Sequence, residues 1–444
     1  MALTGIEIYK LLPQTNCGDC GVPTCLALAM KLAAGHTELL RCPHVSEESK
    51  ARLESASAPP VAPVSIGGFK TGGETVLFRH EKTFVSPTGI AILVTDDMPA
   101  PEIDRRLADF KRLRYNRVGI EIAADLVALK SVTGDSAAFK ALVEKAAGAV
   151  DAGLILISDS PAVLAAGLAP VVSRRPLLYA ATPGNAAEVG ALALENKCPV
   201  AVRGANIDEV IDLTGKLSSM GVKEIVIDSG ARTMKKAFED QVVIRRAAVK
   251  SSFRALGYPT IVFPCEMTDD LMEETLIASV FIAKYAGIAV MSDLKGESLF
   301  PLLVERMNIF TDPQRPMATE QGIYPINNPD ENSPVLITTN FSLTYFIVSG
   351  EIEGSRLPAW LLIMDVEGLS VLTAWAAGKF VADTIGPFVK KCGIAEKVSH
   401  RSLVIPGYSA SISGELEDEL PDWTITIGPR EAAHIPAFMK QYRI

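Results

Sequence analysis

Short apolar runs alternate with longer amphipathic stretches between residues 91 and 310, and this alternation restricts the fold more than any other feature. The runs have the length and composition of buried strands, whereas stretches such as 136–150 have helical periodicity. Eight β–α units match a (βα)8 TIM-like barrel in number and size, and a doubly wound sheet is the alternative. The predicted strands are 91–95, 117–122, 154–158, 177–181, 199–203, 224–228, 260–264 and 288–292.

A turn-rich stretch at 324–334 leads into a second α/β pattern. This pattern predicts a small, open, Rossmann-like sheet whose ligand lies at the carboxyl ends of its strands. Small, polar and glycine-rich strand ends leave room for a large planar ligand and its phosphate tail. The predicted strands are 334–339, 360–365, 402–406 and 424–428, with one long helix at 368–392 and a last helix at the C-terminus. The strand ends are residues 338–340, 365–370, 406–410 and 428–430.

The overall composition limits the possible function classes. The formal net charge of the 444 residues is −9 and no basic run occurs, so nucleic acid is not an expected partner. The first residues lack the basic and apolar regions of a signal peptide, and the apolar runs stay below the length of a membrane span. We therefore expect a cytoplasmic protein without a membrane anchor, whose cysteines favour metal binding over disulfides.

A cysteine-rich segment near the N-terminus is the strongest single motif. Gaps of two, four and sixteen residues separate the four cysteines, so a tight loop can aim three thiolates at one centre. Gly18 and Gly21 permit the turns of that loop, and the helix that begins at the third cysteine favours an anionic cluster at its N-terminal end. Pro43 follows the fourth cysteine, as is common for cluster ligands. The predicted metal ligands are Cys17, Cys20, Cys25 and Cys42.

Three kinds of cysteine site compete for this motif, and a 4Fe–4S cluster is the favoured one. A structural zinc site also uses four thiolates but usually has two Cys-x-x-Cys pairs, and only one is present. A plant-type 2Fe–2S site has the four-residue gap before the two-residue gap, which is the reverse order. The other cysteines, Cys198, Cys265 and Cys392, are expected to be buried, inert thiols.

The sequence divides into four predicted parts. A Ser-, Ala- and Pro-rich stretch at 55–65 indicates a semi-extended linker, and alternation at 74–84 predicts a hairpin. The predicted domains are a 4Fe–4S cluster domain (1–57), a linker and hairpin (58–90), a TIM-like barrel (91–325) and a ligand-binding domain (326–444).

The order of these parts, and above all the segment TNCGDCGVPTCLALAMKLAAG, resembles the large (gamma) subunit of the corrinoid iron–sulfur protein of the reductive acetyl-CoA pathway. The resemblance covers the whole chain. It implies a methyltransferase-type corrinoid carrier that takes a methyl group from methyltetrahydrofolate or a related pterin and delivers it to acetyl-CoA synthase. The implied partners are the small subunit in a heterodimer, the methyltetrahydrofolate:corrinoid methyltransferase and CO dehydrogenase/acetyl-CoA synthase. The 4Fe–4S cluster then returns oxidised cobalt to its active state.

The resemblance further implies a corrinoid in domain 326–444 with no histidine ligand to cobalt. Asp-x-His-x-x-Gly, which supplies that ligand in many corrinoid domains, does not occur, and the nearest analogue, DVEGLS, has no histidine. We expect the corrin over the helix start at Ser370–Ala374, with Leu372 and Thr373 near the lower cobalt face. The expected corrinoid-binding residues are Thr339, Asn340, Thr344, Phe346, Gly368, Ser370, Val371, Leu372, Thr373, Ala374, Gly378, Gly407, Tyr408 and Arg430.

Charged residues at the predicted barrel strand ends favour another function class, an iron–sulfur electron-transfer oxidoreductase with a catalytic barrel. No Gly-x-Gly-x-x-Gly follows a strand, which disfavours a nicotinamide or flavin enzyme. The resemblance implies a structural and docking role for the barrel, so no catalytic residue is assigned. The charged strand-end residues are Asp96, Asp97, Glu121, Asp159, Arg203, Asp228, Glu266 and Asp293.

Overall fold

The structure is a computed structural model that describes residues 5–33, 37, 41–46, 49–50, 58–117, 120–312 and 316–442. The chain forms two compact units, one from residues 1–115 and 122–310 and the other from 116–121 and 311–444. Within the described ranges, no helix combines the length and hydropathy needed to cross a bilayer.

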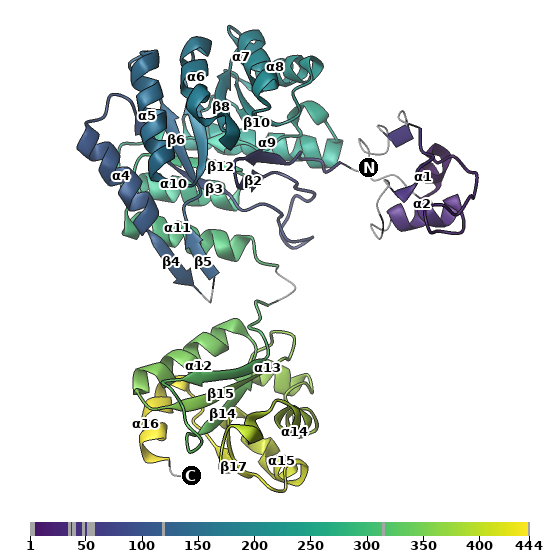
Figure 1. Cartoon of the computed structure of the whole chain (residues 1–444), viewed down its shortest axis with the longest axis vertical. Coiled ribbons are helices and arrows are strands. Elements are labelled where there is room, and N and C mark those ends of the chain that lie inside the picture. Colours follow the sequence, from purple (N-terminus) through teal and green to yellow (C-terminus); the bar gives the residue numbers. More distant parts are fainter. Residues whose placement is uncertain are drawn as a thin grey trace. The chain divides into compact units, whose positions relative to one another are not determined.

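Among its described residues, the N-terminal module includes the short helices α1 (Gly5–Leu11) and α2 (Cys25–Ala33) (Figure 1). Ile8 and Leu12 pack with Leu28 and Ala29 in a small core of their own. The loop between the helices carries two of the four predicted metal ligands, Cys17 and Cys20, and Cys25 is the first residue of α2.

Eight parallel strands form the barrel, and each strand is followed by a helix, as predicted. The strands are bonded in the order β10-β9-β8-β7-β6-β3-β12-β11, and a bridge between Ile227 and Thr260 brings β10 next to β11. The barrel is therefore nearly closed, and the doubly wound alternative is wrong. The strands are β3 (Gly89–Thr95), β6 (Leu126–Lys130), β7 (Gly153–Ile157), β8 (Leu177–Ala181), β9 (Val200–Arg203), β10 (Ile225–Asp228), β11 (Ile261–Val262) and β12 (Ile288–Met291). The helices are α4 (Ala100–Arg112), α5 (Ser136–Ala149), α6 (Pro161–Leu168), α7 (Ala186–Asn196), α8 (Ile207–Met220), α9 (Met234–Ser251), α10 (Leu271–Ala283) and α11 (Gly296–Ile309).

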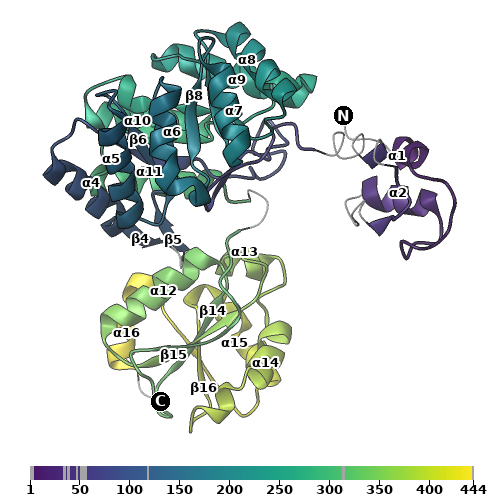
Figure 2. The ribbon, with the colours of Figure 1, turned by 45° about the horizontal axis from the view of Figure 1, so that its top comes forward.

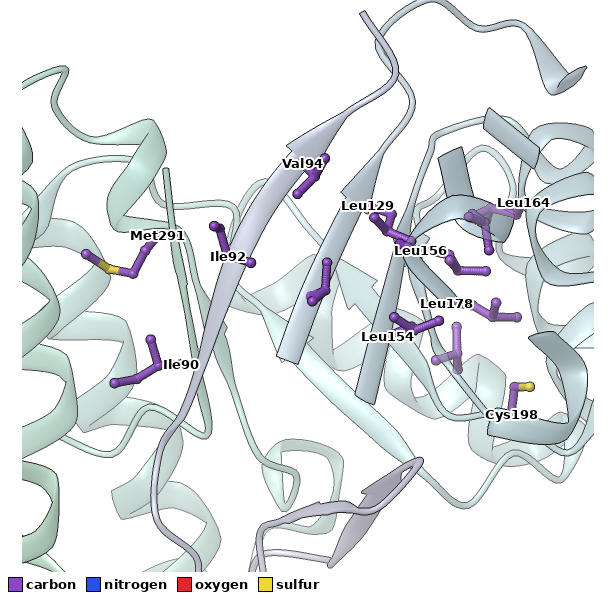
Figure 3. Packing of buried hydrophobic residues seen from close by; sticks show 14 of the residues in the cluster. Ile90, Ile92, Val94, Leu129, Leu154, Leu156, Leu164, Leu178, Cys198 and Met291 are labelled. Carbon is purple, nitrogen blue, oxygen red and sulfur yellow. The ribbon is translucent and has the colours of Figure 1, made fainter. Parts of the chain in front are cut away.

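Strand side chains alternate between two buried layers. Outward-facing residues such as Ile92 and Leu156 pack against the helices, and Figure 3 shows Leu164 of α6 in this layer. Inward-facing residues such as Ala128 and Phe263 fill the barrel interior. Because both faces of every strand are covered, the strands read as continuous apolar runs in the sequence.

A short hairpin covers the N-terminal end of the barrel. It consists of β1 (Val64–Ile66) and β2 (Phe69–Thr71), and Val64 and Ile66 are buried among the inward-facing residues. A Cβ atom at Gly153 would lie 2.7 Å from the carbonyl oxygen of Ile66, so only glycine fits at this contact. The predicted hairpin at 74–84 is wrong, because the strands of the observed hairpin lie earlier in the sequence, at 64–66 and 69–71. Of the predicted linker, residues 55–57 lie outside the described residues, and Ser65 belongs to β1.

One predicted barrel strand, 117–122, is also wrong. This segment contributes to a separate two-stranded sheet of β4 (Arg114–Arg117) and β5 (Ile120–Ala123), and Ile120 is exposed. The second barrel strand is instead β6, whose first four residues are fully buried. An alternating, half-exposed segment cannot serve as a barrel strand, which is covered on both faces.

The C-terminal unit has an open five-stranded sheet with the order β13-β15-β14-β16-β17. All neighbouring strands are parallel except for β13, which is antiparallel to β15. Figure 2 shows α12 and α16 on one side of the sheet and α14 and α15 on the other, which agrees with the two apolar clusters that cover its faces. The strands are β13 (Gly322–Ile326), β14 (Val335–Thr339), β15 (Ala359–Met364), β16 (Ser402–Ile405) and β17 (Thr424–Ile427). The helices are α12 (Ser342–Ser355), α13 (Val371–Ala376), α14 (Ala382–Lys391), α15 (Ser413–Glu419) and α16 (Ile435–Gln441).

The single long helix predicted at 368–392 is wrong, because it divides into α13 and α14. Gly378 has a left-handed φ of 69°, and the backbone N–H groups of Lys379 and Phe380 both donate to the carbonyl oxygen of Ala374. This turn ends α13 and allows Phe380 to enter the core, where it is fully buried.

Candidate functional site

The cysteine loop has the backbone geometry that its glycines predicted. Gly18 and Gly21 have φ values of 79° and 76°, and the N–H of Gly21 donates to the carbonyl oxygen of Gly18 (2.8 Å). The side-chain oxygen of Asn16 accepts the N–H of Cys25 (2.8 Å), which fixes the loop at the start of α2. Glycine adopts a left-handed backbone conformation at a lower free-energy cost than other residues, so Gly18 and Gly21 set the path of the loop.

All four predicted ligands belong to the N-terminal module, and three of them share one apolar cluster. Cys25 and Cys42 are buried in its apolar cluster, and the half-buried Cys20 packs against them. Cys17 is exposed, and its sulfur lies within 4.8 Å of the Asp19 carboxylate and the His44 ring. His44 and Asp19 are joined by a contact of 2.6 Å.

This contact connects the segment of Cys42 to the loop of Cys17 and Cys20. Hydrogen bonds from His44 and then Cys17 hold the pKa of Asp19 below its usual value. An arrangement of four free thiols around a glycine-rich loop suits a thiolate-bound metal centre.

Of the other three cysteines, Cys198 is buried as predicted, whereas Cys265 and Cys392 are half-buried. Burial raises the pKa of Cys198 to about 11, and it also raises the pKa values of Cys265 and Cys392. A thiol that resists ionisation is a weak nucleophile and a weak ligand.

A cavity of about 320 Å³ lies at the carboxyl edge of the C-terminal sheet. The chain runs from β14 to β15 on one side and returns to β16 on the other, and α/β folds bind ligands where strand order reverses in this way. The α12 residues Thr344, Ile347 and Val348 form one wall with helical spacing. The cavity is lined by Leu336, Ile337, Thr338, Thr344, Ile347, Val348, Ser370, Val371, Leu372, Val404, Ile405, Pro406, Tyr408, Gly428, Pro429, Arg430, Glu431, Ala432 and Ile435.

The predicted corrinoid residues divide into two groups by their place relative to this cavity. Six line it: Thr344, Ser370, Val371, Leu372, Tyr408 and Arg430. Eight do not: Thr339, Asn340, Phe346, Gly368, Thr373, Ala374, Gly378 and Gly407. Ile347 and Val348 line the cavity but were not predicted, although their i+3 and i+4 spacing from Thr344 is a signal in the sequence.

Asn340 has a structural task within the protein. Its amide nitrogen donates to Asp365 (2.8 Å), and its oxygen accepts the N–H groups of Val366 and Gly368, each at 3.0 Å. These bonds hold the turn after β15 that leads into α13.

Thr373 lies in α13, and its hydroxyl is 3.0 Å from that of Ser370.

The C-terminal cavity and its surroundings are apolar in one part and polar in another. Thr339 Oγ1 and Ser409 Oγ are buried without a hydrogen-bond partner among the described residues, and each is one residue from the cavity lining. Buried hydroxyls normally have partners, so these two oxygens keep unused hydrogen-bonding capacity close to the cavity. Ile347, Leu372 and Tyr408 expose more than two fifths of their surface at the cavity, which suits an apolar plane.

Paired charges occupy the carboxyl end of the barrel. Asp228 is 2% exposed, accepts hydrogen bonds from Tyr179 and Gly230, and pairs with Arg232 (2.9 Å). Arg232 also pairs with Glu266, whose other oxygen lies 2.8 Å from Lys130. Burial, and then the charge of Asp228, raise the pKa of Tyr179 well above its usual value. These groups satisfy one another, as expected of a structural network.

The remaining strand-end residues are held in a similar way. Arg203 pairs with Asp159 (2.8 Å), and Asp293 pairs with Arg105 (2.8 Å). Asp96 accepts hydrogen bonds from residues 131–133, and Asp97 accepts one from Thr95. Burial tends to raise the pKa of Asp96, but those hydrogen bonds outweigh it and keep the pKa low. Glu121 was wrongly expected at a barrel strand end, because it lies in β5.

The fold and these sites together define a multidomain α/β protein. It consists of a cysteine-rich module of the kind that binds metal, a nearly closed barrel and an open sheet. A family model described as "CO dehydrogenase/acetyl-CoA synthase delta subunit" matches residues 67–439, and a model described as "Putative Fe-S cluster" matches residues 12–44. The chain is 45% identical to the corrinoid/iron-sulfur protein large subunit of Moorella thermoacetica, over 99% of both chains.

Archaeal proteins are similar over the same length. Identity to the acetyl-CoA decarbonylase/synthase complex subunit gamma is 34% in Methanopyrus kandleri, over 99% of this chain and 98% of the relative. It is 36% in Methanosarcina acetivorans, over 98% of each chain. The chain therefore belongs to the family of corrinoid/iron-sulfur protein large subunits, to which these gamma subunits are similar.

Proposed function

We propose that this chain is a corrinoid methyl carrier of the acetyl-CoA pathway. It accepts a methyl group from methyltetrahydrofolate or a related pterin through a methyltransferase and delivers it to acetyl-CoA synthase. The observation that carries the proposal is the cavity at the strand-order reversal of the C-terminal sheet, which six of the predicted corrinoid residues line. Family membership supports it independently, because the relative from Moorella is named for a corrinoid and an iron–sulfur group.

The cavity residues would hold the corrinoid without an imidazole ligand. Both ring nitrogens of His400 are engaged, with the carbonyl oxygen of Ser333 (3.0 Å) and the N–H of Ser402 (3.2 Å). His434, the other histidine of this domain, is not among the lining residues. Leu372, which lines the cavity at the start of α13, would exclude water from the bound corrinoid, whereas Thr373 does not line the cavity.

Cys17, Cys20, Cys25 and Cys42 would hold one 4Fe–4S cluster. The glycine turns and the helix start at Cys25 favour its negative charge. When both groups are bound, the corrinoid supplies a cobalt that carries the methyl group, and the cluster supplies the electron that reactivates oxidised cobalt.

The barrel would serve as a scaffold and as a docking domain for the small subunit in a heterodimer. The name of the Moorella relative, a large subunit, supports such a partner. The charge network around Asp228 supports a structural role for the carboxyl end of the barrel, because its charges are paired with one another. The domain boundaries 1–57, 58–90, 91–325 and 326–444 stay predictions, as does a place in the cytoplasm.

A visible spectrum of the anaerobically purified protein, together with metal analysis, tests the proposal. We expect corrin absorption bands, about one cobalt, and about four irons per chain. Cluster absorption without a corrinoid, even after incubation with cobalamin, would instead indicate an electron-transfer protein. Zinc in place of iron would contradict the cluster assignment.

A further inference from the structure

Two loops form one side of the C-terminal cavity, and their backbones are bonded to each other. The loop after β16 contributes Pro406 and Tyr408, and the loop after β17 contributes residues 428–432. The N–H of Gly407 donates to Pro429 (3.1 Å), and the N–H of Gly428 donates to Ile405 (2.8 Å). The two loops therefore form one connected rim.

Gly407 makes this close contact possible. A Cβ atom at this position would lie 2.6 Å from the carbonyl oxygen of Gly428 and 2.7 Å from the nitrogen of Arg430. Any larger residue would push the loops apart. The base of the rim is thus fixed by backbone contacts, and its shape does not depend on a ligand.

One side chain joins the two loops above this base. The Tyr408 hydroxyl donates to Glu431 Oε1 (2.7 Å), and both residues line the cavity. The hydrogen bond to Glu431, and then the charge of Glu431, raise the pKa of Tyr408. Tyrosine combines an apolar ring with a polar tip, so it can contact an apolar ligand while its hydroxyl stays bonded at the surface.

We propose that Tyr408 is a retention residue, and that its hydrogen bond to Glu431 holds the phenol ring at the cavity rim and slows release of the bound corrinoid. This inference rests on the proposed function. Without the bond, the exposed ring gains rotamer freedom and the rim loses its side-chain connection. Because backbone contacts fix the base of the rim, loss of this hydrogen bond should change the rate of corrinoid release and leave the fold unchanged.

Exchange of bound radiolabelled cobalamin against an excess of unlabelled cobalamin measures this release. Tyr408→Phe keeps the ring and removes the hydrogen bond, and one such bond corresponds to about a two- to tenfold faster release. Tyr408→Ala also removes the ring and should release the corrinoid faster still. Glu431→Ala should match Tyr408→Phe, and the double variant should add nothing further because the pair acts as one unit.

Two variants serve as controls. Glu431→Gln retains an acceptor oxygen and should release cobalamin more slowly than Glu431→Ala. Tyr324→Phe removes a comparable hydrogen bond, from Tyr324 to the carbonyl oxygen of Glu320 (2.7 Å), at a residue that does not line the cavity, and should behave like the wild type. Wild-type release rates in Tyr408→Phe and Glu431→Ala would overturn the retention role while the proposed function stands. A wild-type protein that does not bind cobalamin would overturn both.

Discussion

Cys17, Cys20, Cys25 and Cys42 differ in exposure although one metal centre is proposed for all four. Cys25 and Cys42 are buried, Cys20 is half-buried, and Cys17 is exposed. Burial usually raises a thiol pKa, whereas a metal and a helix N-terminus favour the thiolate. The residues that the spacing selected therefore combine a protected interior side with an accessible edge.

Replacing Cys20 with alanine tests the cluster at the residue scale. We expect Cys20→Ala to lose nearly all its iron because a four-thiolate site cannot close. Methyl donation from already methylated protein should persist, whereas reductive rescue of oxidised protein should fail. Iron analysis and electron paramagnetic resonance measure the first effect. Cys392→Ala, at a half-buried thiol of the C-terminal unit, should keep full iron content, and full iron in Cys20→Ala would contradict the ligand assignment.

At the element scale, the separation of α13 from α14 depends on Gly378. Its left-handed φ of 69° ends α13 before the next helix begins, and an added Cβ would meet no atom within 4 Å. The cost of a larger residue here is therefore one of backbone conformation alone. Ser370 and Leu372 lie at the start of α13, and the turn that follows the end of this helix needs a conformation that only glycine adopts at low cost.

Two glycine-to-alanine substitutions should change stability in opposite directions. Gly378→Ala should lower the free energy of unfolding by about 1 kcal/mol, because alanine is strained at positive φ. Gly414→Ala, in the helix α15 and also without close neighbours, should raise it by about 0.5–1 kcal/mol through helix propensity. Chemical denaturation followed by circular dichroism measures both. Equal effects of the same sign would show that Gly378 does not control this helix end.

At the scale of the whole molecule, the N-terminal module, the barrel and the C-terminal sheet each have their own apolar core. Ile8 and Leu28 represent the first, Phe139 and Phe263 the barrel layers, and Ile385 the C-terminal sheet. Parts with separate cores can unfold independently of one another, and multidomain proteins commonly depart from two-state behaviour.

Calorimetry should therefore record more than one unfolding transition. Cobalamin at a hundred times its dissociation constant should stabilise the transition of the C-terminal unit by about 2.7 kcal/mol and leave the barrel transition unchanged. Cys20→Ala provides a control, because it should affect only the transition of the N-terminal module. A single two-state transition that shifts as a whole on cobalamin addition would contradict this independence.

The sequence by itself determined the local and repetitive features of this protein. Cysteine spacing and the left-handed glycines at 18 and 21 depend on neighbouring residues alone, so both were visible before any fold was known. Seven of the eight barrel strands were also visible, because a strand covered on both faces is a continuous apolar run. The carboxyl edge of the C-terminal sheet could be chosen from the order of its elements.

The tertiary structure decided which segments use those patterns. Residues 117–122 and 126–130 both have strand character, and only packing against neighbouring strands selects β6 for the barrel. Likewise, the hydrogen bond from Asn340 to Asp365 joins residues 25 positions apart. The rim bond between Tyr408 and Glu431 joins residues 23 positions apart. Burial and pairing depend on such distant neighbours, and local sequence does not encode them.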